Sequence, residues 1–183
     1  MTERKENASA QVVGLVLAGG RGKRMGATGS KVLMRLLGEH MLHYIYQALS
    51  FVLPEESIWT IVGHKREQVE EAFPRYATRF IHQESQLGTG HALMCARPRL
   101  LDSGATHCLV VNGDVPLLSP RTIRDLQQQA VSLQADMAFR TMRLANPTGY
   151  GRVIRGEAGL VDRIVEDRDL GPGQEQADEV NAG

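Results

Sequence analysis

An apolar run from Val12 to Ala18, VVGLVLA, constrains the fold most, because it contains no charged or polar side chain. A continuous run of this kind is typical of a parallel strand that is covered on both faces. The stretch from Leu17 to Lys31, LAGGRGKRMGATGSK, follows at once and holds five glycines and four basic residues. Open parallel sheets bind ligands beyond the carboxyl ends of their strands, so the sequence places a cationic loop at a ligand-binding edge.

Strand and helix patterns alternate along the rest of the chain. Further strands are predicted at 57–63, 78–83, 107–114 and 136–144, and helices within 38–50, 65–73, 88–100 and 119–134. In the last of these, Ser119 is predicted to cap the helix, Pro120 to open it, and Ile123, Leu126, Ala130 and Leu133 to form its apolar face. A hairpin is predicted over 151–167 with its turn at 156–159, and the tail 171–183 is predicted to be a loop. The alternation predicts an α/β fold, an open and mostly parallel twisted sheet with helices on both faces, as in Rossmann-like proteins.

Length and charge limit the possible partners. The 183 residues suit a single domain over 12–183, preceded by a flexible leader at 1–11. The net charge is zero, so neither a nucleic acid nor a membrane is expected as a partner. No acidic residue lies between Glu6 and Glu39, whereas five basic residues do, which indicates one local anionic ligand. The sequence shows no signal peptide, no apolar run of about 18 residues and no metal-spaced cysteine pair, and we expect a cytoplasmic protein.

The glycine-rich loop has the composition of a phosphate site. Glycines let backbone N–H groups approach an anion closely, and neighbouring Arg and Lys side chains add charge. Two common phosphate loops are excluded: Leu17 stands where a P-loop needs its first glycine, and Met25 stands where the dinucleotide fingerprint needs its third. The simpler interpretation is a glycine turn with solvated cations, which the position after a buried strand makes less favoured.

Two polar residues end other predicted strands. Asp114 is placed to hold Mg²⁺, which prefers oxygen ligands, although a local turn hydrogen bond would explain it equally well. The Gln83 carboxamide offers a donor and an acceptor to a pyrimidine base, and Gly88 and Thr89 could add backbone contacts. On chemistry alone, Gln83 is more simply interpreted as a surface residue beside a helix cap.

Four segments resemble a known family. Leu17-Ala18-Gly19-Gly20-x-Gly22-x-Arg24-Met25 followed by Lys31 resembles the signature of sugar-nucleotide pyrophosphorylases. QLGTGHA (86–92), NPTGYGRV (146–153) and EVNAG (179–183) narrow the resemblance. In this order they are similar to the N-terminal uridylyltransferase domain of the bacterial bifunctional UDP-N-acetylglucosamine pyrophosphorylase/glucosamine-1-phosphate acetyltransferase, from about Val12 to the end of the chain.

The resemblance implies an activity and a set of site residues. The implied reaction converts UTP and N-acetylglucosamine-1-phosphate into UDP-N-acetylglucosamine and pyrophosphate, for cell-wall precursor synthesis, with Mg²⁺ as cofactor. Catalysis is assigned to Arg24 and Lys31, and the metal to Asp114. The implied nucleotide contacts are Leu17, Ala18, Gly19, Gly20, Gly22, Lys31, Gln83, Gly88, Thr89, Asn112, Gly113 and Asp114, and the implied sugar contacts are Gly151, Glu166 and Asn181. Without the resemblance, the last three are more simply a turn glycine, a solvent-facing acid and a loop residue.

The sequence departs from the family in two places. Many relatives have proline where Ser30 stands, which predicts a looser placement of Lys31. The chain also ends at Gly183, before the Asn that serves the family as second metal ligand and before the acetyltransferase β-helix that builds its trimer. We therefore expect residues 1–183 alone to bind UTP–Mg²⁺ weakly and turn over poorly, and assign no oligomeric state. The alternatives are another sugar-phosphate or cofactor nucleotidyltransferase, since RMGATGSKVL also resembles molybdenum-cofactor nucleotidyltransferases, and a nucleotide-binding fragment without turnover.

Overall fold

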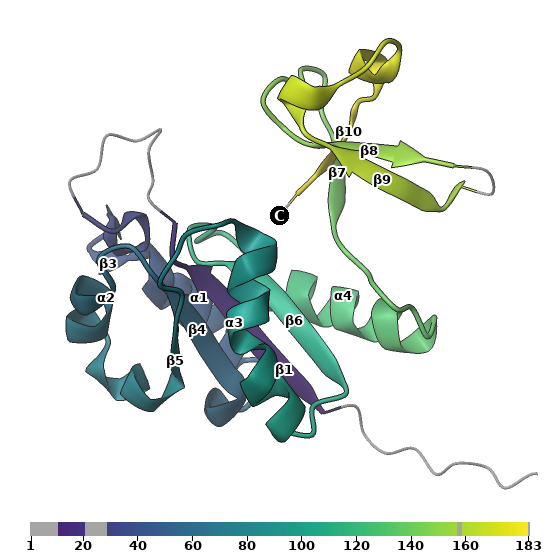
Figure 1. Ribbon diagram of the computed structural model, residues 1–183. Coiled ribbons are helices and arrows are strands. Elements are labelled where there is room, and N and C mark those ends of the chain that lie inside the picture. The colour runs from purple at the N-terminus through teal and green to yellow at the C-terminus, as the bar shows by residue number, and fades with distance from the viewer. Residues whose placement is uncertain (1–10, 21–28, 157–158, 183) are drawn as a thin grey trace, which may run out of the picture. The chain divides into compact units, whose positions relative to one another are not determined.

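A computed structural model of the chain describes residues 11–20, 29–156 and 159–182. The chain folds into two compact units, Met1–Gln127 and Gln128–Gly183, and each is described by itself (Figure 1). No helix among these described residues is both long and apolar enough to cross a membrane.

The first unit is built on a four-stranded parallel sheet in the order β5-β4-β1-β6. Its strands are β1 (Val12–Ala18), β4 (Ile58–Val62), β5 (Phe80–His82) and β6 (His107–Asn112). The chain first builds the sheet on one side of β1 and then returns to place β6 on the other side. The border between β1 and β6 is therefore the topological switch point, where open parallel sheets bind their ligands. All four strands fall within the predicted ranges.

Three helices connect these strands and a fourth follows β6, as predicted. They are α1 (Met41–Ser50), α2 (Arg66–Ala72), α3 (Thr89–Asp102) and α4 (Pro120–Ser132). The start of α4 is confirmed, because Ser119 Oγ accepts a hydrogen bond of 3.1 Å from the N–H of Thr122 and Pro120 opens the helix. Leu133 was wrongly assigned to the apolar face of this helix, since it lies beyond the helix end and is 76% exposed.

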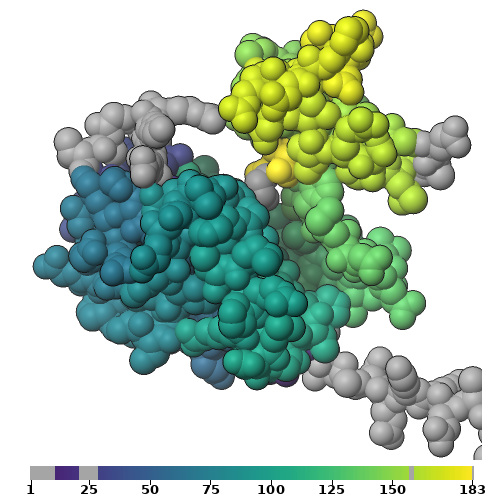
Figure 2. Space-filling model, in the orientation of Figure 1, coloured from purple at the N-terminus to yellow at the C-terminus, as the bar shows by residue number. Residues whose placement is uncertain are grey.

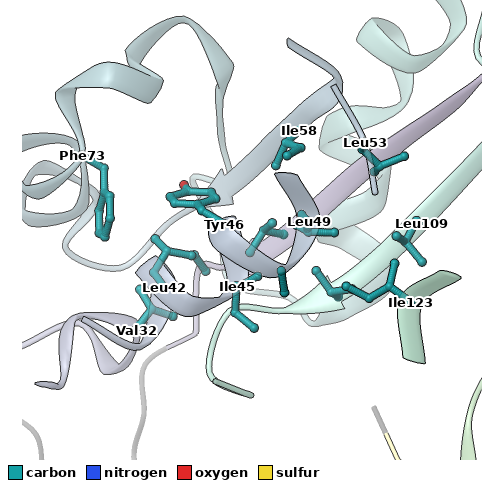
Figure 3. Close-up of a cluster of buried hydrophobic side chains, with 14 of the residues drawn as sticks. Val32, Leu42, Ile45, Tyr46, Leu49, Leu53, Ile58, Phe73, Leu109 and Ile123 are labelled. Carbon is teal, nitrogen blue, oxygen red and sulfur yellow. The ribbon is translucent and has the colours of Figure 1, made fainter. Parts of the chain in front are cut away.

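The core confirms that helices cover both faces of the sheet. On one face, Val12 and Val16 of β1 belong to the cluster that includes α1 and α4, in which Leu42, Ile45, Leu49 and Ile123 are buried (Figure 3). On the other face, Val13 and Leu15 pack with Ala92 and Ala96 of α3. This helix lies in front of the sheet in Figure 1, and its residues cover the strands in the space-filling view (Figure 2). The alternation along β1 thus gives the α/β fold that the sequence predicts.

A small hairpin that the sequence did not reveal precedes α1. β2 (Arg35–Leu36) pairs with β3 (Glu39–His40), and Leu37 and Gly38 between them have φ angles of 50° and 95°. Two consecutive positive φ values are characteristic of the two-residue hairpin turn that suits the strand twist. Strands of two residues are too short to show any hydrophobic period, which is why the pattern missed them.

The second unit holds an antiparallel sheet in the order β7-β10-β8-β9. β8 (Arg152–Arg155) and β9 (Val161–Val165) form the predicted hairpin, although residues 157 and 158 of its turn lie outside the described part. β7 (Thr141–Arg143) is much shorter than the predicted strand at 136–144.

The prediction that the tail is a loop was wrong for β10 (Glu179–Asn181). This strand lies inside the sheet, where Val180 pairs with Met142 on one side and Arg152 on the other. Val180 is completely buried, but it is the single apolar residue of a three-residue strand. The strand forms through pairing with residues far away in the sequence, and a local pattern cannot show that.

We predict that an ion pair in this sheet makes the second unit sensitive to acid. Two nitrogens of Arg155 donate to the carboxylate of Glu179 at 2.8 and 2.6 Å. These bonds, with a further one from Thr141, lower the pKa of Glu179 to about 2. A carboxylate with a lowered pKa stabilises the folded state above its unfolded pKa of about 4.3, and this contribution is lost as the pH falls from there to about 2.

The prediction is tested by urea unfolding at several pH values in this window. Arg155→Met should make the free energy of unfolding fall less steeply than in the wild type between about pH 4.3 and pH 2. Arg163→Met is the matched control, since Arg163 pairs with its neighbour Asp162 at the surface. Parallel curves for the wild type and Arg155→Met would show that the pair does not set the acid sensitivity.

Candidate nucleotide site

Residues from distant parts of the sequence meet at the carboxyl edge of the parallel sheet. Gly19 follows β1, Gly63 follows β4, Gln83 follows β5, and Gly113 and Asp114 follow β6. Because the four strands are parallel and adjacent, their carboxyl ends lie along one edge. The structure therefore brings together the base, phosphate and metal candidates of the first unit.

A cation and a carboxylate face each other at the switch point. Lys31 Nζ lies 2.5 Å from Asp114 Oδ2, and about 30% of each side chain is exposed. Lys31 opens a short 3₁₀ turn that is held by the buried Val32, and Asp114 comes just after β6. A partly exposed ion pair contributes little stability, so it can separate at small cost when a phosphate or a metal ion arrives. The pair supplies the two charges that a metal-bound phosphate requires, one of each sign.

Ser30, which stands where many relatives have proline, has a backbone conformation that proline could also adopt. Its φ of −66° is the value to which proline is restricted, so the backbone has the conformation that proline would impose. The Ser30 N–H donates to Gln68 Oε1 of α2 at 3.3 Å, and only 3% of the residue is exposed. The hydrogen bond to α2 fastens a backbone that proline would fix through its ring, and the looser placement of Lys31 stays a prediction.

Gly113 lies where the end of β6 packs closely against the 3₁₀ turn that carries Lys31. A Cβ at this position would lie 3.0 Å from the carbonyl oxygen of Leu17 and 3.0 Å from Val32 Cγ1, and the Gly113 N–H donates to the same carbonyl at 3.0 Å. A larger residue would force the turn away from the sheet. Packing therefore explains this glycine, and the nucleotide contacts of Asn112, Gly113 and the backbone of 17–20 remain predictions.

Gln83 is a buried residue, in contrast to the surface interpretation. Only 5% of it is exposed, and its Nε2 lies 3.2 Å from the carbonyl oxygen of Gly88 and 3.1 Å from His91 Nδ1. Its Oε1 points to Gly19, where an added Cβ would lie only 2.8 Å away. Gly88 has a φ of 106°, which favours glycine, and the helix α3 begins directly after it at Thr89. A buried carboxamide thus stands at the sheet edge, next to the glycine loop.

Gly63 is a site residue that the sequence analysis did not single out. A Cβ there would lie 3.1 Å from the carbonyl oxygens of Gln83 and Gly19 and 3.1 Å from Gln86 Nε2. The next residue, His64, donates its N–H to the carbonyl of Gly19 at 3.3 Å. The signal was present in the sequence, since Gly63 is the last residue of a predicted strand, and Gly19 and Gly113 also lie at the carboxyl ends of predicted strands.

Two predicted residues lie outside the described part of the chain. Gly22 and Arg24 fall in 21–28, so the proposed catalytic role of Arg24 stays a prediction. Within 11–20, 29–156 and 159–182, no group of three or more His, Cys, Asp or Glu residues could hold a metal ion. Asp114 therefore belongs to no such group among these residues, and an ion bound to it would also need phosphate or water oxygens.

The three predicted sugar residues meet in the second unit. The Gly151 carbonyl accepts a hydrogen bond of 3.0 Å from the backbone N–H of Asn181. A Cβ at Gly151 would lie 3.0 Å from Ile164 Cγ2 and 3.9 Å from Glu166 Oε1. Gly151, Glu166 and Asn181 thus gather at one end of the antiparallel sheet, with a glycine where the space is tight.

The parallel sheet, with a glycine loop, a cation–carboxylate pair and a buried amide at its carboxyl edge, defines the class of α/β nucleotidyltransferase folds. The chain belongs to the family of MobA-like NTP transferase domains, whose family model matches residues 14–165. The resemblance to nucleotidyltransferases that the motifs indicated is thereby confirmed.

Curated relatives agree with the narrower resemblance. The chain is 44% identical over 174 residues to the bifunctional protein GlmU of Nitratidesulfovibrio vulgaris (strain DSM 19637 / Miyazaki F), covering 92% of this chain and 37% of that protein. It is 39% identical over 175 residues to the bifunctional protein GlmU of Halorhodospira halophila, covering 95% of this chain and 35% of that protein. The chain thus spans little more than a third of the length of these relatives.

Solved structures share the fold at low sequence identity. A putative glucose-1-phosphate thymidylyltransferase from Bacillus anthracis, in complex with a sucrose, has a TM-score of 0.71 and 16% identity, and the match covers 94% of this chain and 69% of that one. A mannose-1-phosphate geranyltransferase from Thermus thermophilus has a TM-score of 0.66 and 23% identity, with 86% and 50% covered. These similarities confirm the fold class.

Proposed function

We propose that this chain is the uridylyltransferase part of a protein that makes UDP-N-acetylglucosamine and pyrophosphate from UTP and N-acetylglucosamine-1-phosphate. The observation that most supports this proposal is the Lys31–Asp114 pair at the switch point, which lies at the same carboxyl edge of the sheet as the buried Gln83. The similarity to GlmU proteins over 92% of the chain favours uridylyl transfer over the other nucleotidyl transfers. The product would serve cell-wall precursor synthesis in the cytoplasm.

The proposed reaction is an in-line nucleotidyl transfer. An oxygen of the sugar phosphate attacks the α-phosphorus of UTP, a new P–O bond forms, and the bond to the leaving pyrophosphate breaks. Such a transfer needs little covalent work from the protein, so catalysis is positioning and charge stabilisation. The Lys31 ammonium would stabilise the charge that builds up on the phosphate oxygens, while Arg24 is proposed to act from the same loop.

A divalent cation, which we propose is Mg²⁺, would bind with the nucleotide. Mg²⁺ is a hard cation that often binds through one or two carboxylates together with phosphate oxygens, and Asp114 offers a carboxylate for this purpose. When bound, such an ion neutralises phosphate charge. Lys31 then has to leave Asp114, and the exposure of both side chains makes that exchange inexpensive.

The remaining residues are each proposed to bind one part of the substrates: the base, the phosphates or the sugar. Gln83, with Gly88 and Thr89, would face the base, and the backbone of 17–20 would face the phosphates. Gly151, Glu166 and Asn181 would bind the sugar, since a carboxylate and an amide suit sugar hydroxyls and a glycine admits a ring close to the backbone.

The test is pyrophosphate release by residues 1–183 with N-acetylglucosamine-1-phosphate and each of the four nucleoside triphosphates. We expect release with UTP, and less with other sugar phosphates than with N-acetylglucosamine-1-phosphate. Release with another base or sugar would indicate a different nucleotidyltransferase. Binding of UTP without any pyrophosphate release would support the alternative of a nucleotide-binding module.

Asp114→Asn should raise the Mg²⁺ concentration for half-maximal rate by about tenfold, because losing one charge in a partly exposed site costs on the order of 1 kcal/mol of ion affinity. The substitution keeps the shape of the side chain, so the melting temperature should stay near that of the wild type. Asp125→Asn is the control, since Asp125 pairs with Arg121 on α4 and its substitution removes the same charge. A magnesium titration of Asp114→Asn that superimposes on the wild type would remove Asp114 from the metal site.

A further inference from the structure

The orientation of the Gln83 carboxamide is fixed by the carbonyl oxygen of Gly88, which can accept a hydrogen bond but cannot donate one. Its Nε2 lies 3.2 Å from the carbonyl oxygen of Gly88, which already accepts the N–H of Ala92 at 3.1 Å. The opposite orientation would place two oxygens against each other, so the nitrogen must face Gly88. One of the two amide hydrogens is thereby used.

His91 determines where the second amide hydrogen goes. Its Nδ1 lies 3.1 Å from the same Gln83 nitrogen, and it can receive the second hydrogen only as the unprotonated nitrogen of a neutral ring. His91 is the third residue of α3, so the helix carries it to Gln83 at the end of β5. Cys95, one turn later on α3, has its Sγ 4.0 Å from Nδ1 and is only a weak donor.

With both hydrogens used, Gln83 has one polar atom left for a ligand. Its Oε1 makes no hydrogen bond with any residue that the structure describes, and it lies against Gly19 at the sheet edge. A fixed oxygen accepts a hydrogen bond from the N3–H of uracil. The N3 of cytosine carries no hydrogen and would meet that oxygen as a second acceptor.

We propose that His91 is a positioning residue that sets base choice, because it holds the Gln83 carboxamide with its oxygen toward the base. This inference rests on the proposed function, in which Gln83 faces the base of the nucleotide. It predicts that the site binds bases with an N–H at this position, such as uracil, and disfavours cytosine.

The ligand-free protein provides the first test. In ¹⁵N NMR spectra of residues 1–183 at neutral pH, His91 should be the neutral tautomer with its proton on Nε2 and an unprotonated Nδ1. A proton on Nδ1 would overturn the inference, because the ring could then not accept from Gln83. This measurement needs no variant and no turnover.

Two variants of nearly equal shape provide the second test. Asn has an amide oxygen or nitrogen and Leu has a methyl group at the same number of bonds from the backbone as Nδ1 of His. In His91→Leu, the ratio of the dissociation constants for CTP and UTP should fall by about tenfold, as expected for losing one well-oriented hydrogen bond, whereas inorganic triphosphate should bind as to the wild type. His91→Asn, which can keep the acceptor, should retain most of the ratio. His107→Leu is the control, since His107 opens β6 and faces Thr106.

The outcomes separate this inference from the proposed function. If His91→Leu and His91→Asn weaken UTP, CTP and inorganic triphosphate equally, His91 is merely structural and the inference is overturned. An unchanged ratio in His91→Leu, with pyrophosphate still released from UTP, overturns the inference and leaves the function standing. A ratio that falls in His91→Leu but not in His91→Asn, in a chain that releases no pyrophosphate, supports the inference and counts against the function.

Discussion

Lys31→Ala is expected to lower kcat/KM for UTP by at least about a hundredfold, the size of losing one preorganised contact to developing charge. The ammonium lies 2.5 Å from Asp114 at the switch point, so it stands where the phosphates of a nucleotide are proposed to bind. Its turn is fixed by the buried Val32 and, through Ser30, by Gln68 of α2. Because the cation is held in place before the substrate arrives, its removal should affect kcat as well as KM.

Two further variants sharpen this prediction. Lys31→Arg keeps the charge but replaces a compact ammonium by a planar fork, and should recover only part of the loss. Arg75→Ala removes one positive charge near the amino edge of the sheet, where Arg75 pairs with Glu55, and should leave kcat/KM unchanged. Steady-state kinetics with UTP as the varied substrate measure all three. A value for Lys31→Ala within a few-fold of the wild type would exclude a catalytic role.

The parts of the fold that were predictable are those with a local signal. β1 is a continuous apolar run, and α4 begins with a cap at Ser119 and a proline, so both are visible in a few neighbouring residues. β10 lacks such a signal, because its one buried apolar side chain, Val180, belongs to pairings with residues about 30 to 40 positions earlier in the chain. Local patterns thus recovered the parallel sheet and missed β10, one of the two inner strands of the antiparallel sheet.

The candidate site was likewise predictable only in part. The rule that parallel strands end at a common edge placed Lys31 and Asp114 together before their contact was known. The same rule gave no information on burial, so chemistry alone favoured a surface position for Gln83, of which only 5% is exposed. Its surroundings include Gly19, which follows β1, and His91 of α3, two neighbours that no sequence spacing reveals.

Gly63→Ala is expected to lower kcat/KM for UTP by roughly tenfold to a hundredfold, on the order of the loss that follows small misplacements of groups around a reacting substrate. The new methyl group would lie 3.1 Å from two backbone oxygens, those of Gly19 and Gln83, and both neighbours must move by a few tenths of an ångström. These neighbours belong to the proposed phosphate loop and the proposed base contact. Nucleotide binding should therefore suffer more than sugar-phosphate binding, since Gly151, Glu166 and Asn181 belong to the second unit.

Gly90→Ala is the matched control for this prediction, because a Cβ at Gly90 meets no atom within 4 Å and alanine favours the helix in which it lies. It should keep the kinetics of the wild type and unfold at the same or a slightly higher temperature. Gly63→Ala should unfold only slightly below the wild type, since the strain lies at one edge of an otherwise intact core. If Gly63→Ala bound UTP as tightly as Gly90→Ala does, the carboxyl edge between β1 and β5 would not be where the nucleotide lies.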